Sequence, residues 1–82
     1  MPTEKEYAEK LCSLAKDAFS LNKYDQAVFL LKSLIDNKGA TAQQKAIAYN
    51  NLGWMYYKGQ EGKLEKNFKK AVGYFNIVLT LP

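Results

Sequence analysis

The sequence of 82 residues has no histidine, no arginine and only one cysteine, Cys12. Without histidine the chain lacks the commonest general base and metal ligand, and the cysteine has no imidazole that could activate it as a nucleophile. One cysteine can neither assemble a zinc site nor close an internal disulfide. We therefore expect Cys12 to be a small, partly buried helix residue. We also expect a protein with no enzymatic activity, no cofactor and no bound metal.

Phosphate-binding and acid–base motifs are missing as well. The segment from Gly59 to Lys63, GQEGK, faintly resembles a phosphate-binding loop, but it follows a predicted helix, and Leu64 stands where a serine or threonine would bind magnesium. We expect a turn whose glycines adopt positive φ. The acidic residues are scattered over predicted polar faces and helix ends, so no carboxylate pair is placed for general acid–base catalysis.

Long hydrophobic runs are also absent. The first ten residues, MPTEKEYAEK, are charged and contain no apolar segment of signal-peptide length. The longest apolar stretch near the end, Ala71 to Leu81, is interrupted by Asn76 and is too short to span a bilayer. Since a single cysteine gives no reason to invoke an oxidising compartment, the expected location is the cytoplasm.

The basic residues are all lysine and are concentrated in the second half of the chain. Twelve lysines and eight acids give a net charge of +4, and residues 41–82 carry the whole excess. Five of these lysines form a cluster: Lys58, Lys63, Lys66, Lys69 and Lys70. Such a cluster could weakly attract an anionic surface, either nucleic acid or a membrane. Arginine, which makes bidentate phosphate and guanine contacts, is absent, so we keep this binding only as the alternative to a solvated surface.

Apolar residues recur at helical spacing in four segments. Steps of three and four residues predict helices over about 4–20, 24–38, 42–58 and 67–80. The predicted core stripes of these helices, in chain order, are Ala8, Leu11, Leu14, Ala15 and Ala18; Tyr24, Ala27, Val28, Leu31, Leu34 and Ile35; Ala46, Tyr49, Leu52, Gly53 and Tyr56; and Phe68, Ala71, Val72, Phe75, Val78 and Leu79.

Helix ends are signalled by particular residues. The pairs Thr3 with Glu6 and Thr41 with Gln44 have the spacing of capping boxes and predict the start of the first and third helices. A third N-cap, an asparagine at position 67, precedes the fourth helix. The glycine at position 39 predicts a left-handed stop after the second helix. A glycine at position 53, inside the third helix, indicates close approach of a partner helix.

The second pair of helices repeats the pattern of the first pair. A shift of 38 positions places the stripe of the first helix on that of the third, and a shift of 44 places the second on the fourth. The difference falls in a longer turn, residues 59–66. Two helices in a unit of this length indicate an α-solenoid. We therefore predict an all-α fold in one domain, residues 1–82: an α-solenoid of two antiparallel helix-turn-helix repeats, about 4–39 and 41–82, with four helices.

The same residues carry a resemblance to a known family. The first unit resembles a tetratricopeptide (TPR) repeat at Leu14-Ala15, Ala18, Asn22-Lys23-Tyr24-Asp25-Gln26-Ala27 and Leu31. The second unit resembles the Sel-one-like repeat, a longer-turned relative, at Leu52-Gly53, Tyr56, Gly59, Gly62, Lys70-Ala71 and Tyr74-Phe75. This resemblance covers nearly the whole chain. It implies a scaffold that binds a peptide or protein partner in a groove lined by the first helix of each repeat.

The resemblance also indicates which residues would line this groove. The candidates are Lys16, Phe19, Ile47, Asn50, Trp54, Tyr57 and Lys58. Aromatic rings would offer flat apolar surface, Asn50 could pair with a backbone amide, and Lys16 and Lys58 would favour acidic groups on the partner. Packing of Trp54 against a neighbouring helix is an open alternative to partner contact.

The last helix is apolar on more than one side. Beyond its core stripe it carries Tyr74, Ile77 and Leu81, whereas the second helix has Leu30, Ser33 and Asn37 at the equivalent positions. Since repeat arrays normally end in a polar cap, we expect this face to associate with a further repeat or with a second copy in a homodimer. The sequence ends at Leu81-Pro82, about where a TPR unit carries a proline. A structural fragment of a longer solenoid is therefore a further alternative.

Overall fold

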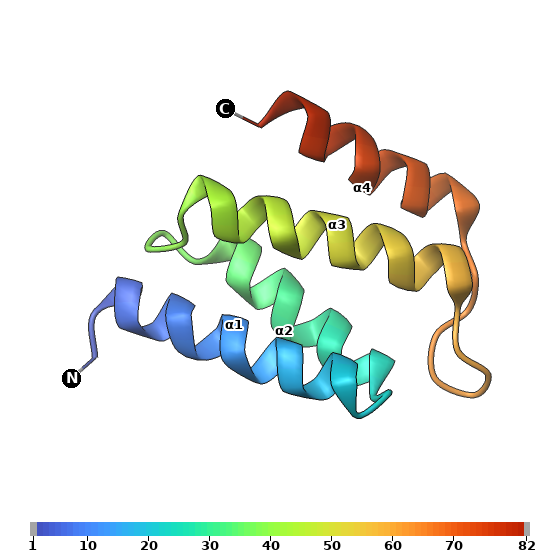
Figure 1. Cartoon of the computed structure of the whole chain (residues 1–82), viewed down its shortest axis with the longest axis horizontal. Helices are drawn as coiled ribbons and strands as arrows, with labels where there is room; N and C mark the ends of the chain where they lie inside the picture. The colour runs from blue at the N-terminus through green and yellow to red at the C-terminus, as the bar shows by residue number, and fades with distance from the viewer. Residues whose placement is uncertain (1, 82) are drawn as a thin grey trace.

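The computed structural model describes residues 2–81 and contains four α-helices, with no strand in that range (Figure 1). The helices are α1 Glu4–Ser20, α2 Tyr24–Asp36, α3 Ala42–Lys58 and α4 Phe68–Thr80. The predicted all-α class is confirmed, and the helix bounds lie within two residues of those expected. Pro82, the expected repeat end, lies outside the described residues. None of the four helices has the length and apolarity needed to cross a membrane.

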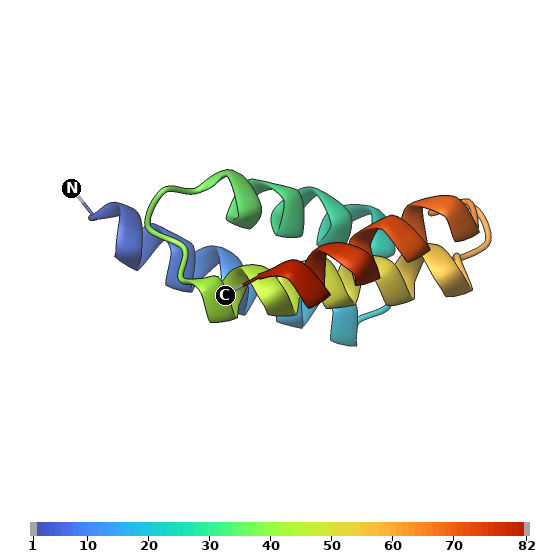
Figure 2. The same cartoon turned by 90° about the horizontal axis from the view of Figure 1, so that it is seen from above.

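Successive helices run antiparallel, and each packs mainly on its neighbour in the sequence: α1 on α2, α2 on α3 and α3 on α4 (Figure 1). Figure 2 shows α2 on one side of α3 and of the C-terminal half of α1. The Cα atoms fill a slab of 38 × 28 × 15 Å. In such an arrangement α1 and α4 are outermost, and each has a side that no other helix covers.

Three helices begin at the predicted capping residues. The hydroxyl of Thr3 accepts a hydrogen bond from the backbone N–H of Glu6 at 3.1 Å. Thr41 and Gln44 form a complete capping box, with hydrogen bonds of 2.9 and 3.0 Å. The side-chain oxygen of Asn67 accepts the N–H of the residue three positions later at 2.9 Å. These bonds satisfy amides that have no partner inside the helix, which explains why the starts were predictable.

The long turn between α3 and α4 is ordered by its own hydrogen bonds. The backbones of Gln60 and Leu64 exchange two bonds, of 2.7 and 2.8 Å. Gly59 and Gly62 have φ of 65° and 76°, as expected for the glycines of this turn. The side-chain oxygen of Gln60 also accepts the backbone N–H of Tyr24 at 3.2 Å. The turn therefore links the α3–α4 pair to the start of α2.

The prediction that Gly39 forms a left-handed stop is wrong. α2 ends at Asp36, and its C-cap Asn37 has an extended backbone, with φ −80° and ψ 127°. Gly39 is not among the residues with positive φ. It lies instead against the backbone of Glu4 and Lys5, where a Cβ atom would have no room. The glycine is needed because the α2–α3 turn touches the start of α1.

The core lies between consecutive helices and consists mainly of small and medium-sized side chains. Its largest fully buried members are Leu34, Leu52 and Met55. Gly53 allows the close approach that the sequence predicts: a Cβ atom there would lie 2.6 Å from the ring of Phe75 on α4. The buried core residues are Ala8, Leu11, Ala15, Ala18, Tyr24, Ala27, Val28, Leu31, Leu34, Ala48, Leu52, Met55, Tyr56 and Ala71.

The predicted core stripes are wrong at four large apolar residues on the two outermost helices. Leu14 on α1 is 42% exposed, and Phe68, Val72 and Leu79 on α4 are 60%, 56% and 82% exposed. Helical spacing identifies the apolar side of a helix, but burial also requires an element that covers that side. α1 and α4 each pack mainly on one neighbour, so part of each apolar side is left open.

Candidate functional site

The candidate residues on α3 form an exposed row. Ile47, Asn50, Trp54 and Tyr57 follow one another at steps of three and four residues, so their side chains emerge on one side of the helix. All four are exposed, and about half of the Trp54 and Tyr57 surface is open to solvent (47% and 50%). Lys58, the last residue of α3, is exposed beside them.

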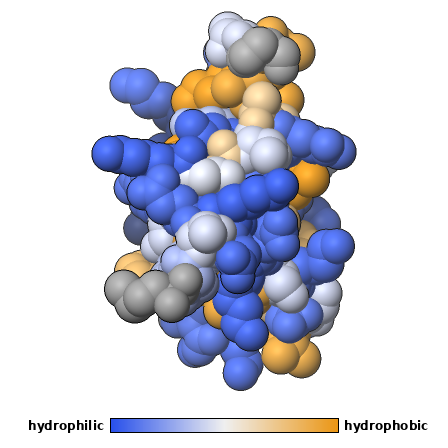
Figure 3. Space-filling model, turned by 90° about the vertical axis from the view of Figure 1, so that its left-hand side faces the viewer, coloured by the Kyte–Doolittle hydropathy of each residue, from blue (hydrophilic) through white to orange (hydrophobic). Residues whose placement is uncertain are grey.

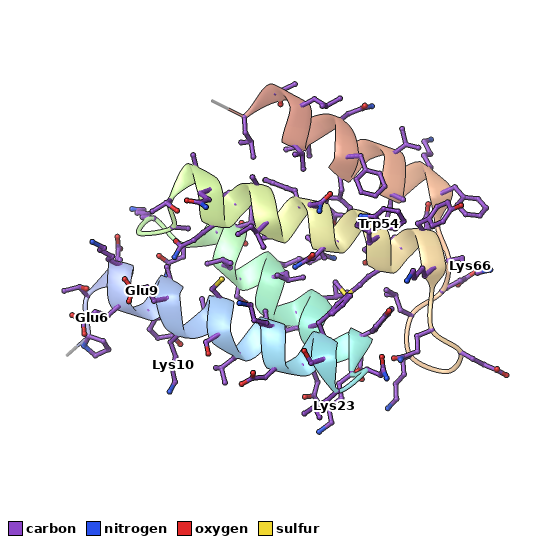
Figure 4. The ribbon with its side chains drawn as sticks, in the orientation of Figure 1. Glu6, Glu9, Lys10, Lys23, Trp54 and Lys66 are labelled. Carbon is purple, nitrogen blue, oxygen red and sulfur yellow. The ribbon has the colours of Figure 1, made fainter. Side chains whose placement is uncertain are left out.

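Rings from α4 hold the two aromatic residues of this row. Trp54 meets Tyr57 edge-on, with 5.8 Å between ring centroids, and meets Phe75 of α4 at 5.6 Å and 75°. Tyr57 lies against Phe68 of α4 at 5.5 Å. We call these four residues the aromatic patch. In Figure 4, Trp54 lies on the side of α3 that faces α4. Edge-to-face geometry is favourable for aromatic pairs, so the contacts restrain the rings while leaving much of their surface exposed.

Trp54 therefore combines the two roles that the sequence left open. It packs against a neighbouring helix through Phe75, and it is also half exposed. The sequence predicts Phe68 and Phe75 for the core stripe of the last helix, not for the row on the third helix. Their part in this surface became visible only when the uncovered side of α4 was known.

The candidate residues on α1 lie apart from the aromatic patch. Phe19 is half-buried and stacks on Tyr24 of α2, with 5.5 Å between centroids and an interplanar angle of 11°. Lys16 is exposed and borders a hollow of about 270 Å³ that includes Gln44 from the first turn of α3. Cys12 lines the same hollow and is partly buried, as expected. The structure thus gathers the α3 candidates with rings of α4 and leaves Lys16 and Phe19 elsewhere.

Two aromatic pairs correspond under the shifts that align the predicted stripes. Phe19 stacks on Tyr24, and Tyr57 lies against Phe68, both at 5.5 Å. The shift of 38 positions maps Phe19 on Tyr57, and the shift of 44 maps Tyr24 on Phe68. Tyr24 is 9% exposed, whereas Phe68 is 60% exposed. The correspondence maps Phe68 onto a buried residue, so by itself it gave no indication that Phe68 is exposed.

The clustered lysines surround the long turn and the start of α4. Lys58, Lys63 and Lys66 line a hollow of about 600 Å³ formed by residues 58–66. Glu61 and Glu65 line the same hollow, so two carboxylates oppose the attraction of the three ammonium groups for an anion. A further lysine of the cluster, at position 70, holds its ammonium nitrogen 5.0 Å from the centre of the Tyr56 ring.

Tyr74, expected on an outer association face, lies instead between α4 and α3. Its ring is 5.8 Å from that of Tyr56 and 6.0 Å from that of Tyr49. Burial raises the pKa of the Tyr74 hydroxyl, Lys32 on α2 opposes this rise, and the two neighbouring tyrosines add to it. Tyr74 therefore contributes to the packing of α4 on α3.

The open apolar side of α4 differs from the expected association face. Ile77 is 37% exposed and Leu81 is partly buried. The most exposed large apolar side chains of α4 are Phe68, Val72 and Leu79. The exposed apolar side of α4 is therefore formed mainly by residues that the sequence predicted for the core, and not by Tyr74, Ile77 and Leu81.

Comparisons of the chain with protein-family models, with curated proteins and with solved structures find no match. Among residues 2–81, no three acidic or cysteine side chains lie together in a way that could hold a metal ion.

Proposed function

We propose that the protein is a non-catalytic protein–protein interaction module built from two TPR-like, Sel-one-like repeats. The antiparallel order of the helices, their consecutive packing and the two equivalent aromatic pairs support the repeat interpretation. In this proposal the module binds a peptide or protein segment along the exposed row of α3. The single cysteine, which cannot close an internal disulfide, favours the cytoplasm as its location.

The observation that carries the proposal is the aromatic patch. Trp54 and Tyr57 are half exposed, and contacts with Phe75 and Phe68 restrain them. Restrained aromatic side chains lose little conformational entropy when a partner covers them, and they supply a large contact area. Tryptophan and tyrosine are accordingly frequent among the residues that dominate binding energy.

The surrounding row indicates the chemistry of the bound segment. Apolar side chains of the partner would pack on the two rings and on Ile47, which is 44% exposed. Asn50, exposed between them, can donate to and accept from the backbone of an extended segment. Lys58 at the end of the row favours an acidic group. Because Lys16 and Phe19 lie apart from the patch, we assign them at most a peripheral part.

The proposal can be tested with peptides selected from a random display library on the folded chain. Trp54→Ala should weaken the selected peptides by roughly 2 kcal/mol or more, measured by calorimetry, with the helical circular dichroism spectrum retained. Phe29→Ala is the matched control, because Phe29 is an aromatic residue of α2 that is 70% exposed and is not part of the row.

Three results would contradict the proposal. One is the failure of any peptide to be enriched. A second is equal binding to the Trp54→Ala and Phe29→Ala variants. The third is loss of folding in Trp54→Ala while affinity per folded molecule is preserved, which would assign Trp54 to packing alone.

The lysine cluster supports a second candidate, weak binding of a nucleic acid or an anionic membrane. The supporting observation is that Lys58, Lys63 and Lys66 are exposed around one hollow. Affinity for a polyphosphate would fall steeply as salt rises, whereas binding of an apolar peptide to the aromatic patch would not. A steep salt dependence that Lys63→Gln and Lys66→Gln reduce would favour this candidate.

A further inference from the structure

A continuous apolar stripe runs along one side of α4, next to the side that packs on α3. It consists of Phe68, Val72, Phe75 and Leu79, and we call it the α4 stripe. The successive steps of four, three and four residues are those of helix-pairing seams. Phe68, Val72 and Leu79 are mostly exposed, and Phe75 is partly buried beside Trp54. Figure 3 shows apolar surface gathered over α4, whereas the side of the molecule below it is largely hydrophilic.

The equivalent stripe on α2 is covered. The shift of 44 positions maps the α4 stripe onto Tyr24, Val28, Leu31 and Ile35. The first three of these are 9%, 8% and 3% exposed, and Ile35 is partly buried. α2 packs on both α1 and α3, whereas α4 packs mainly on α3. The α4 stripe is therefore a helix-packing surface that lacks its second helix.

Head-to-tail stacking of identical copies would not cover this stripe well. α3, which packs on α2, contributes the fully buried Ala48 and Met55. By the shift of 38 positions, Ala48 corresponds to Lys10 of α1 and Met55 corresponds to Asp17. Both of these charged residues are exposed. If α1 of another copy packed on α4 as α3 packs on α2, it would bury both charges at a cost in desolvation.

The charges of α4 favour pairing with the same helix of a second copy in the opposite direction. α4 carries Lys69 and Lys70 in its first turn, and it has no further charged residue up to Leu81. In a parallel pair these lysines would lie side by side and repel. In an antiparallel pair, each lysine-bearing end lies beside the uncharged C-terminal end of the other helix, whose free carbonyls attract cations.

We propose that the occupant of the α4 stripe is the α4 stripe of a second copy, packed antiparallel across a two-fold axis. Two-fold dimers are the commonest protein assemblies, and their contacts are reciprocal. In this register Phe68 lies opposite Leu79 of the second copy, and Val72 lies opposite Phe75. The stripe shares Phe68 and Phe75 with the aromatic patch, but the dimer is measured with the chain alone and does not depend on peptide binding.

Sedimentation velocity over micromolar to millimolar concentrations tests the dimer. The unmodified chain should show a monomer–dimer equilibrium. Val72→Lys and Leu79→Lys should each weaken it by about tenfold or more, because every dimer would then place two ammonium groups against apolar side chains. Phe29→Lys is the matched control on α2, and Ile77→Lys is a control on α4 outside the stripe. Both should leave the equilibrium nearly unchanged.

Disulfide cross-linking tests the direction of the pair in a Cys12→Ser background. A mixture of Phe68→Cys and Leu79→Cys chains should form mixed dimers under mild oxidation, since the two positions are opposite each other. Each variant alone should cross-link poorly, because its two cysteines lie at opposite ends of the seam.

Several outcomes would overturn this proposal. A monomer at every concentration excludes the second copy and leaves the stripe to a further helical repeat. A dimer unaffected by Val72→Lys and Leu79→Lys uses another surface. If Phe68→Cys chains cross-linked to one another more readily than to Leu79→Cys chains, the two helices would be parallel. Circular dichroism spectra of the variants separate all these results from unfolding.

Discussion

Gln60 caps a helix that begins 36 positions earlier: its side-chain oxygen accepts the backbone N–H of Tyr24 at 3.2 Å. Tyr24 is the first residue of α2, and the N-cap of this helix, Lys23, makes no side-chain hydrogen bond. The turn between α3 and α4 thus supplies the cap that the local sequence of α2 does not. This bond ties the second helix pair to the first.

Gln60→Ala should lower the free energy of unfolding by about 1 kcal/mol, the usual value of a helix cap. Urea unfolding followed by circular dichroism measures this change. Gln43→Ala is the control, because Gln43 is exposed in the first turn of α3 and makes no cap of this kind. Equal stability of the two variants would show that the bond to Tyr24 contributes nothing.

The two helical glycines Gly53 and Gly73 should respond in opposite ways to alanine. A Cβ atom at position 53 would lie 2.6 Å from the ring of Phe75, and one at position 73 would meet nothing within 4 Å. We expect Gly53→Ala to cost about 1–3 kcal/mol through displacement of α4. Gly73→Ala should stabilise the protein by about 0.5–1 kcal/mol, because alanine favours the helix. Thermal unfolding of both variants measures the sign, and a gain in stability at position 53 would contradict the packing described.

Leu34 and Leu79 both belong to predicted core stripes, but only Leu34 is buried. Leu34 is fully buried, and Leu79 is 82% exposed. Leu34→Ala should therefore cost about 2–5 kcal/mol by leaving a cavity. Leu79→Ala should change stability by less than about 0.5 kcal/mol when the protein is dilute enough to be monomeric. Comparable losses at the two positions would mean that α4 has a different rotation about its axis.

Tyr74 should make stability fall at alkaline pH. Burial raises the pKa of its hydroxyl above the usual 10.0, with Lys32 opposing the rise. Above about pH 10 the unfolded chain therefore loses this proton more readily than the folded chain. The contribution of Tyr74 to stability is fully present at lower pH, and it is lost as pH rises from that point through the folded-state pKa.

The variant Tyr74→Phe isolates this effect from the titration of the lysines. The free energy of unfolding, measured in urea between about pH 9 and 11, should decline less steeply in Tyr74→Phe than in the unmodified protein. Parallel declines would show that the hydroxyl titrates equally in the two states.

The helices were predictable because the signals that define them are local. Thr41 and Gln44 cap one another within four residues, and the capping oxygen of Asn67 reaches only three positions ahead. The role of Gly39 was not predictable, since its close approach is to the backbone at the start of α1. The burial of Leu79 was misjudged for the same reason: helical spacing carries no information about whether a further helix covers α4.

The candidate site likewise has a part that the sequence predicted and a part that it did not. The row on α3 was found from its spacing and from the resemblance to TPR repeats, and its exposure agrees with a surface role. The contribution of Phe75 depends on how closely α4 approaches Trp54, which only the packed structure reveals. Phe19 was assigned to the surface, but its ring is occupied by Tyr24.

Consecutive packing of the helices also has a consequence for the order in which the chain folds. Since the main helix contacts join neighbours in the sequence, few distant segments must meet, and we expect rapid folding. On the ribosome, α1 and α2 can associate as soon as both have emerged. The bond between Tyr24 and Gln60 is the exception, because its acceptor is synthesised 36 residues after its donor. α2 is therefore translated before its cap, and the N–H of Tyr24 lacks this acceptor until the segment from Gly59 to Lys66 leaves the exit tunnel.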